Sequence, residues 1–417
     1  MIVYDDYVPT NLAWLPNVPA HWRVLPNYAL FEERDERGGT PEDLLLSVTI
    51  DRGVMPQIDL GERDSARDDK SRYKRVRRGD IAYNKMRMWQ GAAGSSDWDG
   101  IVSPAYVVVT PRVGMDVRYF HYLFRVPAFT RESYRRSYGI CDDQLSLRYF
   151  DFKRMYIPVP SLEEQHAIVR FLEERERDIE LYLATKREAA SAVVELQRAR
   201  IDSVVTRHKT KPIQLRRLAN LVTSGSRGWA EYCGAEGAAF IRIGSLTRDS
   251  LGLRIDATER LNLPSNVRVE AERSRVLSGD VLLSITAYIG SVAVVPAEIE
   301  EAYVSQHVAL VRLRPDAEVA PKWAGYCLLS SPGQEQGEKM TYGGTKAGLS
   351  LDDVRSYEIP VPSLAEQHRA INEIERALEQ SASLLKGLER QIAAMEEYRT
   401  RLIADAVTGQ IDVRRLG

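Results

Sequence analysis

A long hydrophobic repeat runs through the C-terminal part of the chain. Apolar or small side chains recur there at alternating steps of three and four residues, with Arg399 at one slot. The positions are Ile371, Ile374, Leu378, Ser381, Leu385, Leu388, Ile392, Met395, Leu402 and Ala406. This spacing is typical of a coiled-coil seam, because it keeps one stripe of a helix facing a partner. It predicts a long helix, interrupted by no proline and by a single glycine, Gly387.

A second, looser seam lies in the middle of the chain. Its apolar positions are Val169, Leu172, Ile179, Leu183, Ala190 and Val193, and it is interrupted by Glu176, Lys186 and Gln197. Since each seam needs a partner, we expect the two helices to pair with each other as an antiparallel coiled coil. The residues expected to make this pairing are Leu172, Ile179, Leu183, Leu378, Leu385, Leu388 and Ile392.

Both helices follow the same short motif, which indicates an internal repeat. Ile157–His166 recurs as Ile359–His368 with nine identities in ten positions, at an offset of 202 residues. A Pro-x-Pro step cannot lie inside a helix, so each motif should begin extended. Ser161 or Ser363 then serves as the helix N-cap, and the glutamate three residues later closes a capping box. The chain therefore consists of two copies of one unit.

The stretches that precede the two motifs differ in character from the helices. They carry short β-rich runs that are broken by Gly, Asp and Pro. The sequence therefore predicts an α+β protein with two mixed α/β domains, at 1–156 and 207–358. Each domain is followed by a helical spacer, at 157–206 and at 359–417, the second of which includes the C-terminal tail.

Local patterns predict elements inside these domains. Lesser helices are expected near Val117–Phe124 and Pro321–Leu329. Val281–Ala297 carries no charge, but its 17 residues include serine, glycine and proline. Because a membrane helix needs about 20 apolar residues, we expect paired strands there and no membrane segment.

Composition narrows the class of protein further. The 417 residues are 44% apolar and 28% charged, which excludes wholesale disorder, a collagen and a disulfide miniprotein. Cys141, Cys233 and Cys327 lie far apart and supply neither a disulfide scaffold nor a zinc clamp. The N-terminus has Asp5 and Asp6 where an export signal would be basic and then apolar. We therefore expect a cytoplasmic protein.

The formal net charge of −2 conceals one local cluster of cations. Eight lysines and arginines accompany a single acid between positions 70 and 88: Lys70, Arg72, Lys74, Arg75, Arg77, Arg78, Lys85 and Arg87. Tyr73, Tyr83 and Trp89 are interleaved with them or follow them. Such a mixture suits DNA, because cations neutralise phosphates while other side chains reach base edges. A solvated basic face would look the same, so both interpretations stay open.

Smaller groups add further candidate DNA contacts. Arg131, Arg135 and Arg136 accompany Tyr134 and Tyr138 before a glycine. In the second domain the candidates are Arg227 and Trp229, in a glycine-containing turn, and Lys346, in the loop that ends Gly343-Gly344-Thr345-Lys346.

Residue patterns for catalysis are missing from the sequence. It contains neither the glycine-rich loop and Asn/Asp-Pro-Pro-aromatic tetrad of an adenine methyltransferase nor a Walker A element. Gly343–Lys346 has the letters of a phosphate loop without its spacing. His166 and His368 have no second ligand one turn away, so we interpret them as polar helix-start residues. We predict no catalytic residues and no metal site in this chain.

These features together resemble the specificity (S) subunit of Type I restriction-modification systems. In that family two target-recognition domains are each followed by a helical spacer with a Pro-x-Pro opening, here Ile157–Ile168 and Ile359–Ile371. Further similar stretches are Trp14–Trp22, Thr223–Trp229, Phe240–Leu246, Gly279–Leu282, Ser305–Val308 and Gly348–Leu351. The resemblance covers essentially the whole chain.

The resemblance implies a non-catalytic subunit that reads a bipartite, interrupted target in double-stranded DNA. It implies docking of two methyltransferase (M) subunits and, in a full restriction complex, two restriction (R) subunits. S-adenosylmethionine would bind to the M partner, ATP and magnesium to the R partner, and no cofactor to this chain.

Three alternatives remain open at this point. One is a coiled-coil DNA-binding adaptor of a stand-alone methyltransferase without a restriction partner. A self-contained nuclease is disfavoured because no convincing acidic-acidic-Lys cluster occurs. A purely structural coiled-coil adaptor would bind no specific duplex.

Overall fold

The computed structural model describes residues 2–61, 70–139, 144–255, 259–341 and 348–416. The chain divides into two compact units. Unit 1 comprises Met1–Thr185 and Gln391–Gly417, and unit 2 comprises Lys186–Arg390. The long helices α5 (Leu162–Thr206) and α11 (Leu364–Val407) each contribute one part to each unit.

Unit 1 is built on a four-stranded antiparallel sheet with the order β4-β11-β8-β9. Smaller pairs form between β1 and β2, β3 and β12, β5 and β6, and β7 and β10. The strands are β1 (Tyr7–Leu12), β2 (Leu15–Pro19), β3 (Arg23–Pro26), β4 (Phe31–Glu33), β5 (Leu46–Thr49), β6 (Gly53–Pro56), β7 (Lys74–Val76), β8 (Ile81–Asn84), β9 (Ala93–Ser95), β10 (Gly100–Val102), β11 (Tyr106–Pro111) and β12 (Tyr156–Val159). The shorter helices are α1 (Asn27–Leu30), α2 (Val117–Leu123), α3 (Pro127–Arg136) and α4 (Tyr149–Phe152), with 3-10 turns η1 (Gln57–Leu60), η2 (Met88–Gln90) and η8 (Val413–Arg415).

Unit 2 repeats this sheet as β14-β21-β18-β19 and adds a second sheet, β15-β17-β16-β20, in which β16 and β20 are parallel. The strands are β13 (Ile213–Gln214), β14 (Ala219–Ser224), β15 (Cys233–Gly234), β16 (Ala238–Ile241), β17 (Arg260–Leu261), β18 (Val281–Ser284), β19 (Val292–Val294), β20 (Ala302–Val304), β21 (Val308–Leu313) and β22 (Glu358–Ile359). The helices are α6 (Leu215–Leu218), α7 (Ser265–Ala271), α8 (Pro321–Leu329), α9 (Ser331–Met340) and α10 (Leu351–Ser356), with 3-10 turns η4 (Trp229–Tyr232), η5 (Ile243–Ser245), η6 (Glu272–Ser274) and η7 (Pro315–Ala317).

The internal repeat is confirmed in the pairing of the strands. Val109 of β11 pairs with Ile81 of β8, and Val311 of β21 pairs with Val281 of β18. The central strands bury both faces, as their continuous apolar runs require. The helices expected near Val117–Phe124 and Pro321–Leu329 are present as α2 and α8, and Val281–Ala297 forms the antiparallel pair β18-β19.

The long helices begin at the predicted positions, but the capping box is only half formed in each. Ser161 accepts a hydrogen bond from the Glu164 amide (3.2 Å), while the Glu164 carboxylate turns away to Tyr4 and His21. At the second helix the Glu366 carboxylate accepts from the Ser363 amide (3.0 Å) and hydroxyl (2.6 Å). Each unit thus uses a different half of the same motif.

A buried glutamine in each motif ties the helix to its domain. The Gln165 side chain accepts from the Asp116 amide before α2 (2.9 Å) and donates to the Pro160 carbonyl (3.0 Å). Gln367 accepts from the Ala320 amide before α8 (2.8 Å) and donates to the carbonyls of Pro362 and Glu318. Both side chains are buried. The repeated glutamine therefore fixes how each spacer leaves its domain.

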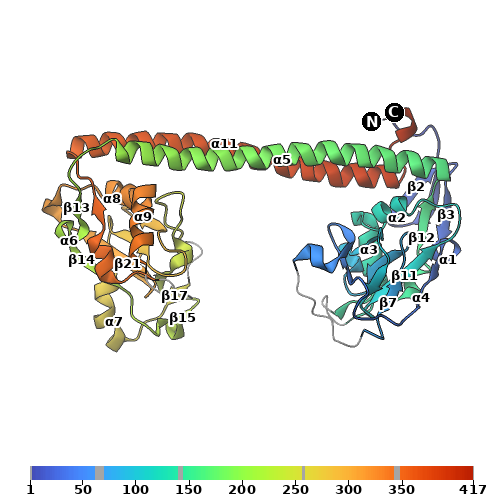
Figure 1. Cartoon of the computed structure of the whole chain (residues 1–417), viewed down its shortest axis with the longest axis horizontal. Coiled ribbons are helices and arrows are strands. Elements are labelled where there is room, and N and C mark those ends of the chain that lie inside the picture. The colour runs from blue at the N-terminus through green and yellow to red at the C-terminus, as the bar shows by residue number, and fades with distance from the viewer. Residues whose placement is uncertain (1, 62–69, 140–143, 256–258, 342–347, 417) are drawn as a thin grey trace. The chain divides into compact units, whose positions relative to one another are not determined.

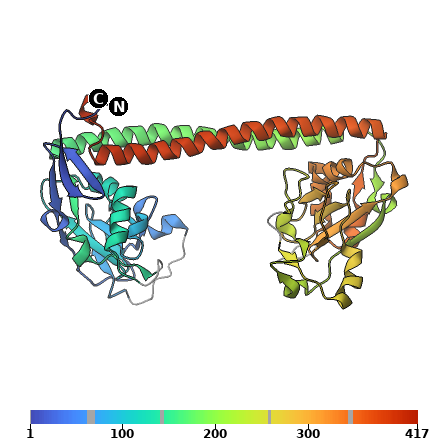
Figure 2. The ribbon, with the colours of Figure 1, turned by 180° about the vertical axis from the view of Figure 1, so that it is seen from behind.

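Helices α5 and α11 pack together in antiparallel fashion and lie side by side in both views (Figures 1 and 2). In unit 1, Arg399 of α11 contacts Glu176 of α5 (2.7 Å). In unit 2, Glu373 of α11 contacts Arg200 of α5 and Arg207, which directly follows α5. Of the residues expected at the seam, Leu172, Ile179, Leu183 and Leu388 are buried, and Leu378, Leu385 and Ile392 are partly buried.

Two charged residues that interrupt the predicted seams, Glu176 and Arg399, form an ion pair with each other. The Glu176 carboxylate receives hydrogen bonds from the Arg399 guanidinium and from the Tyr122 hydroxyl of α2 (2.6 Å). At the 202-residue offset, unit 2 has Leu378 in place of Glu176 and Gln197 in place of Arg399. At these two seam positions unit 1 therefore has an ion pair, whereas unit 2 has a leucine and a glutamine.

The two ends of the chain meet in unit 1 (Figure 1). The Tyr7 hydroxyl donates to the Gly409 carbonyl (2.8 Å), and the Asp412 amide donates to the Ile2 carbonyl (2.9 Å). Gly409 has φ +75°, and a Cβ there would lie 2.5 Å from Pro19 Cδ. The end of α11 is therefore bound to the first domain, as the end of α5 leads into the second.

The pair Glu176–Arg399 can be tested with the residues of the other unit. We expect Glu176→Leu alone to lower the free energy of unfolding by about 1–3 kcal/mol, because it leaves the arginine and the Tyr122 hydroxyl without their acceptor. Glu176→Leu combined with Arg399→Gln should recover most of this loss. Urea unfolding of the four proteins of the cycle measures the coupling, and strictly additive effects would contradict the pairing.

Candidate nucleic-acid interface

The repeated sheet presents the same edge in both units. The edge consists of residues 85–90 and 103–105 in unit 1, and of residues 285–290 and 305–307 in unit 2; we call it the strand-end edge. Its backbone bonds match: Lys85 N donates to Ala105 O as Ile285 N donates to His307 O, and Leu147 N donates to Lys85 O as Leu349 N donates to Ile285 O. One scaffold therefore carries two different sets of side chains.

The basic run of unit 1 is split into two parts by the fold. Its first part lies on β7 and on either side of it, and the strand faces acids of the segment Glu33–Asp43. Lys74 Nζ lies 2.9 Å from Asp35 Oδ1 and Arg75 Nη1 lies 2.7 Å from Asp43 Oδ1. Arg77 likewise lies 3.1 Å from Glu36. Three cations of this part are therefore paired with acids, which the spacing of the cations alone did not reveal.

Three of the candidate contacts are buried in the fold, in contrast to the expectation from the sequence. Lys70 and Lys74 have relative exposures of 6% and 5%, so neither ammonium is presented to a ligand. Trp229 (4%) packs against Phe240 and Tyr303 and anchors its turn. Lys346 lies outside the described residues.

The second part of the run, Lys85 and Arg87, lies on the strand-end edge. Burial lowers the pKa of Lys85, and repulsion from Lys74 and Arg37 lowers it further. An anion at this edge would relieve that repulsion, because it favours the charged ammonium. Arg87 is exposed beside it in the chain. Arg148, whose charge also acts on Lys85, was not among the candidates from the sequence.

Aromatic contact brings a further basic group to this edge. Trp89 of η2 and Tyr134 of α3 meet edge to face, with ring centroids 5.7 Å apart. Helix α3 carries Arg131, Arg135 and Arg136, which are exposed. Arg136 and Arg135 share the Glu132 carboxylate, at 2.9 and 3.8 Å. Helix α3, which carries these exposed cations, therefore packs on η2, which directly follows Arg87 in the chain.

The remaining candidate DNA contacts, Arg72, Arg78 and Arg227, are exposed but do not form one group. Arg72 and Arg78 are exposed near the acid-paired part of the run, and the Arg78 amide donates to Asp99. Arg227 is exposed in unit 2, in the turn where Gly225 N donates to Ser305 O (3.2 Å). A Cβ at Gly225 would meet the Val304 carbonyl oxygen at 2.0 Å, so this turn requires glycine to reach the strand-end edge.

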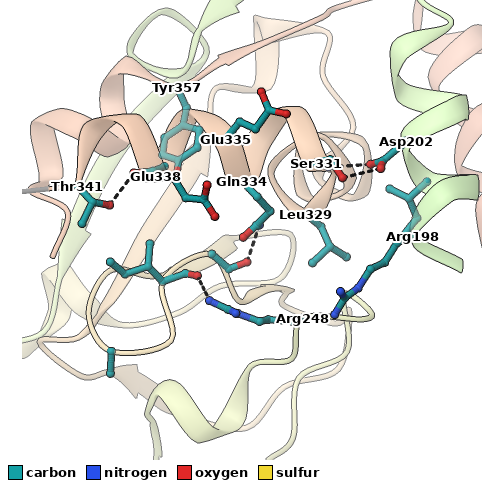
Figure 3. Close-up of a pocket in the computed structure, with 15 residues that line it drawn as sticks. Arg198, Asp202, Arg248, Leu329, Ser331, Gln334, Glu335, Glu338, Thr341 and Tyr357 are labelled. Carbon is teal, nitrogen blue, oxygen red and sulfur yellow. Dashed lines mark hydrogen bonds between the residues drawn. The ribbon is translucent and has the colours of Figure 1, made fainter. Parts of the chain in front are cut away.

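A pocket of about 550 Å³ lies between α5 and α9 in unit 2 (Figure 3). Asp202 accepts from the Ser331 amide (2.7 Å) and hydroxyl (2.6 Å), so the helix is docked directly on the start of α9. Arg198 and Arg248 line the pocket together with Glu335 and Glu338. These mixed charges do not make an anion site, and we interpret the pocket as part of the helix-domain joint.

His121 of unit 1 is a buried histidine with a lowered pKa. Burial lowers its pKa to about 3, and the positive charge of Arg125 acts in the same direction. The imidazole supports two strands: Ser95 N donates to Nδ1 (3.3 Å), and a Cβ at Gly53 or Gly94 would collide with the ring. We therefore assign His121 to the structure and not to a site.

His166, one of the two motif histidines, lies at the start of its helix and contacts the domain that precedes it. His166 Nε2 lies 3.7 Å from the Asp116 carboxylate, next to the joint made by Gln165. Within the described residues, His, Cys, Asp and Glu form no group of three or more suited to a metal ion. The described helices also include none that is long and apolar enough to cross a membrane.

Comparison with known proteins shows a similarity to one family. Residues 255–394 match the model of the Type I restriction modification DNA specificity domain. The specificity subunit of the Type I restriction enzyme EcoBI from Escherichia coli is 24% identical over 161 residues, which are 38% of this chain. The chain is therefore similar to the Type I specificity subunits. The aligned stretch spans 33% of the EcoBI subunit.

Solved structures show that the fold extends over the whole length. One chain, from a structure on complex assembly and conformational transition of the type I R-M system, has a TM-score of 0.70 at 16% identity. The HsdS subunit from Thermoanaerobacter tengcongensis has a TM-score of 0.50 at 19% identity. In both cases the match covers 94% of this chain and 98% of the other. The specificity-subunit fold is thus present in both units.

The low pKa of His121 gives a prediction with a defined sign. The folded imidazole stays neutral, whereas the unfolded chain takes up a proton below its ordinary pKa of about 6.5. This contribution to stability is complete above pH 6.5 and is lost as the pH falls toward 3, by up to about 1.4 kcal/mol per pH unit. In NMR titrations the ring protons of His121, assigned with His121→Asn, should not shift between pH 8 and 5. A midpoint near 6.5 would refute the burial argument.

Proposed function

We propose that this chain is the sequence-reading subunit of a Type I restriction-modification complex and acts on double-stranded DNA in the cytoplasm. Its two recognition domains each read one part of a bipartite, interrupted target. The observation that carries this proposal is the strand-end edge, which one backbone scaffold builds twice with different side chains. Two different readers on one repeated scaffold suit a target with two different parts.

The long helices support a role as spacer and docking surface in this proposal. Each is held at its start by a buried glutamine and extends over more than 40 residues. Two M subunits would bind along this repeated frame, in line with the complex assembly described for the similar Type I structure. Two R subunits would join in a full restriction complex. Chemistry would reside in the partners: S-adenosylmethionine in M, and ATP with magnesium in R.

The proposed function is tested by binding with the partner present. The full chain, co-purified with its methyltransferase, is incubated with a pool of randomised duplexes, and the bound sequences are determined. Two short specific elements separated by an unspecified gap are the expected result. A structural adaptor would enrich no sequence, and a self-contained nuclease would cleave the pool with magnesium alone. Either result would refute the proposal.

The division of the basic run predicts unequal effects for two arginines. Arg87 lies at the strand-end edge, whereas Arg77 is paired with Glu36. We expect Arg87→Ala to weaken specific and nonspecific binding together, and to reduce the slope of log K against log salt by about 0.9 for one phosphate contact. Arg77→Ala is the matched control and should change the slope less. Equal slopes for Arg87→Ala and the unmodified chain would exclude the edge as a phosphate contact.

A further inference from the structure

The loop at the strand-end edge is built differently in the two units. It joins β8 to β9 in unit 1 and β18 to β19 in unit 2. Asn84 N donates to Ala92 O (3.0 Å) at the base of the first loop, as Ser284 N donates to Ser291 O (2.9 Å) at the base of the second. The loop of unit 2 is shorter by one residue and comprises residues 285–290, which we call the edge loop.

The edge loop presents one large side chain to solvent. Tyr288 has a relative exposure of 69%, and its hydroxyl takes part in no hydrogen bond among the described residues. Counted from the start of the loop, its counterpart in unit 1 is Met88, which is buried. Unit 1 instead exposes the cation Arg87, whose counterpart in unit 2 is Ala287. The two loops therefore differ in which position they expose and in its chemistry.

The backbone of Tyr288 is held from beneath, although its side chain is exposed. The Tyr288 carbonyl accepts hydrogen bonds from the hydroxyls of Ser284 and Ser291, the second at 3.2 Å. Both serines are buried, and the Ser284 hydroxyl accepts in turn from the Ser291 amide (2.9 Å). Ala287 has φ +57°, a conformation that residues other than glycine adopt rarely. The apex of the loop is thus fixed in a costly conformation.

Two side chains from other segments fix the far end of the edge loop. Gln334 of α9 donates to the Gly290 carbonyl (2.8 Å), and Arg248 donates to the Ile289 carbonyl (Figure 3). Gly290 has φ +88°, and a Cβ there would lie 2.0 Å from Gln334 Oε1. A loop that is ordered before binding loses little entropy when it binds, and a tyrosine adds only two rotatable bonds. Tyr288 is therefore preorganised for a contact.

The chemistry of the edge loop suits a base edge better than a phosphate. Residues 285–290 carry no charge, so the loop itself has no cation to neutralise the DNA backbone. In the major groove thymine presents its O4 acceptor beside a C5-methyl group. Tyr288 can match both, because its hydroxyl donates a hydrogen bond at the end of an apolar ring.

We propose that Tyr288 enters the major groove and reads a thymine in the half-site of unit 2. Its ring packs against the C5-methyl group, and its hydroxyl donates to O4. Ser284 and Ser291 are positioning residues, because they act through the backbone of Tyr288. This inference rests on the proposed function, since it names the residue with which one half of the target is read.

The first measurement uses the full chain with its methyltransferase and a randomised duplex pool. Tyr288→Ala should reduce the preference for thymine at one position of one half-site by about 5- to 100-fold, the range for one wrong base pair. The other half-site should be unchanged. Tyr398→Ala, which removes an exposed tyrosine of α11 in unit 1, is the matched control and should leave both half-sites intact.

Changes in the DNA separate the contact of the ring from that of the hydroxyl. Deoxyuridine keeps O4 but lacks the methyl group of thymine. Its substitution for the thymine should weaken binding of the unmodified chain and of Tyr288→Phe, which keeps the ring, and leave Tyr288→Ala unaffected. The thymine contact is wrong if Tyr288→Ala alters a position that is not an A·T pair, or if deoxyuridine weakens all three proteins equally.

A double-mutant cycle tests the positioning role of Ser284. Ser284→Ala should lower the preference at the same position in the unmodified chain and add little to Tyr288→Ala. Equal losses in the two backgrounds, or a loss spread over the whole half-site, would contradict the positioning role. Circular dichroism confirms that each variant is folded.

The inference and the proposed function fail in different ways. If the unmodified chain selects no sequence, the proposed function is wrong. If it selects a bipartite site and folded Tyr288→Ala selects the same site with the same discrimination, the assignment of Tyr288 is wrong and the function stands.

Discussion

The architecture depends on a buried side-chain amide that occurs twice. Gln165 and Gln367 each satisfy a backbone amide at the start of a domain helix and a carbonyl of the Pro-x-Pro step. A buried amide is costly unless its donors and acceptors are paired, so this arrangement tolerates few alternatives. It fixes the direction in which each long helix leaves its domain, and with it the frame on which every other element of the unit is placed.

The repeated frame separates what must be constant from what can vary. Strand pairing, the bonds that close the strand-end edge and the helix joint recur in both units. The side chains on that edge do not: unit 1 presents Lys85 and Arg87, whereas unit 2 presents Tyr288. A recognition protein gains from this division, because the reading side chains can change without loss of the core. The charged pair Glu176–Arg399 shows that even the seam differs between the units.

Periodicity and repetition were sufficient to predict the large features. The seams predicted two paired helices, the Pro-x-Pro step predicted where they start, and the offset of 202 residues predicted the duplicated domains. These signals are local, or depend on matching one part of the chain to another. The strand-end edge was not predictable in the same way, because it joins residues that are far apart in the sequence.

The sequence also did not show which cations of the basic run are paired with acids. Its cations were visible as a cluster, but their partners come from the segment Glu33–Asp43, which only the fold brings to β7. The mixed acidic and basic residues Glu32 to Arg37 were the one hint in the sequence. Trp229 was misjudged for a related reason, since a tryptophan beside glycines in a turn can be an anchor as well as an exposed contact.

Two different readers on one repeated frame should select a two-part DNA target. Mapping of methylated adenines across the genome of the host, with and without this gene, tests it most directly. We expect one interrupted motif, with two unlike specific parts and a fixed gap, that is methylated only when the gene is present. A methylation pattern that does not change when the gene is removed, or a gene-dependent motif with a single uninterrupted part, would contradict it.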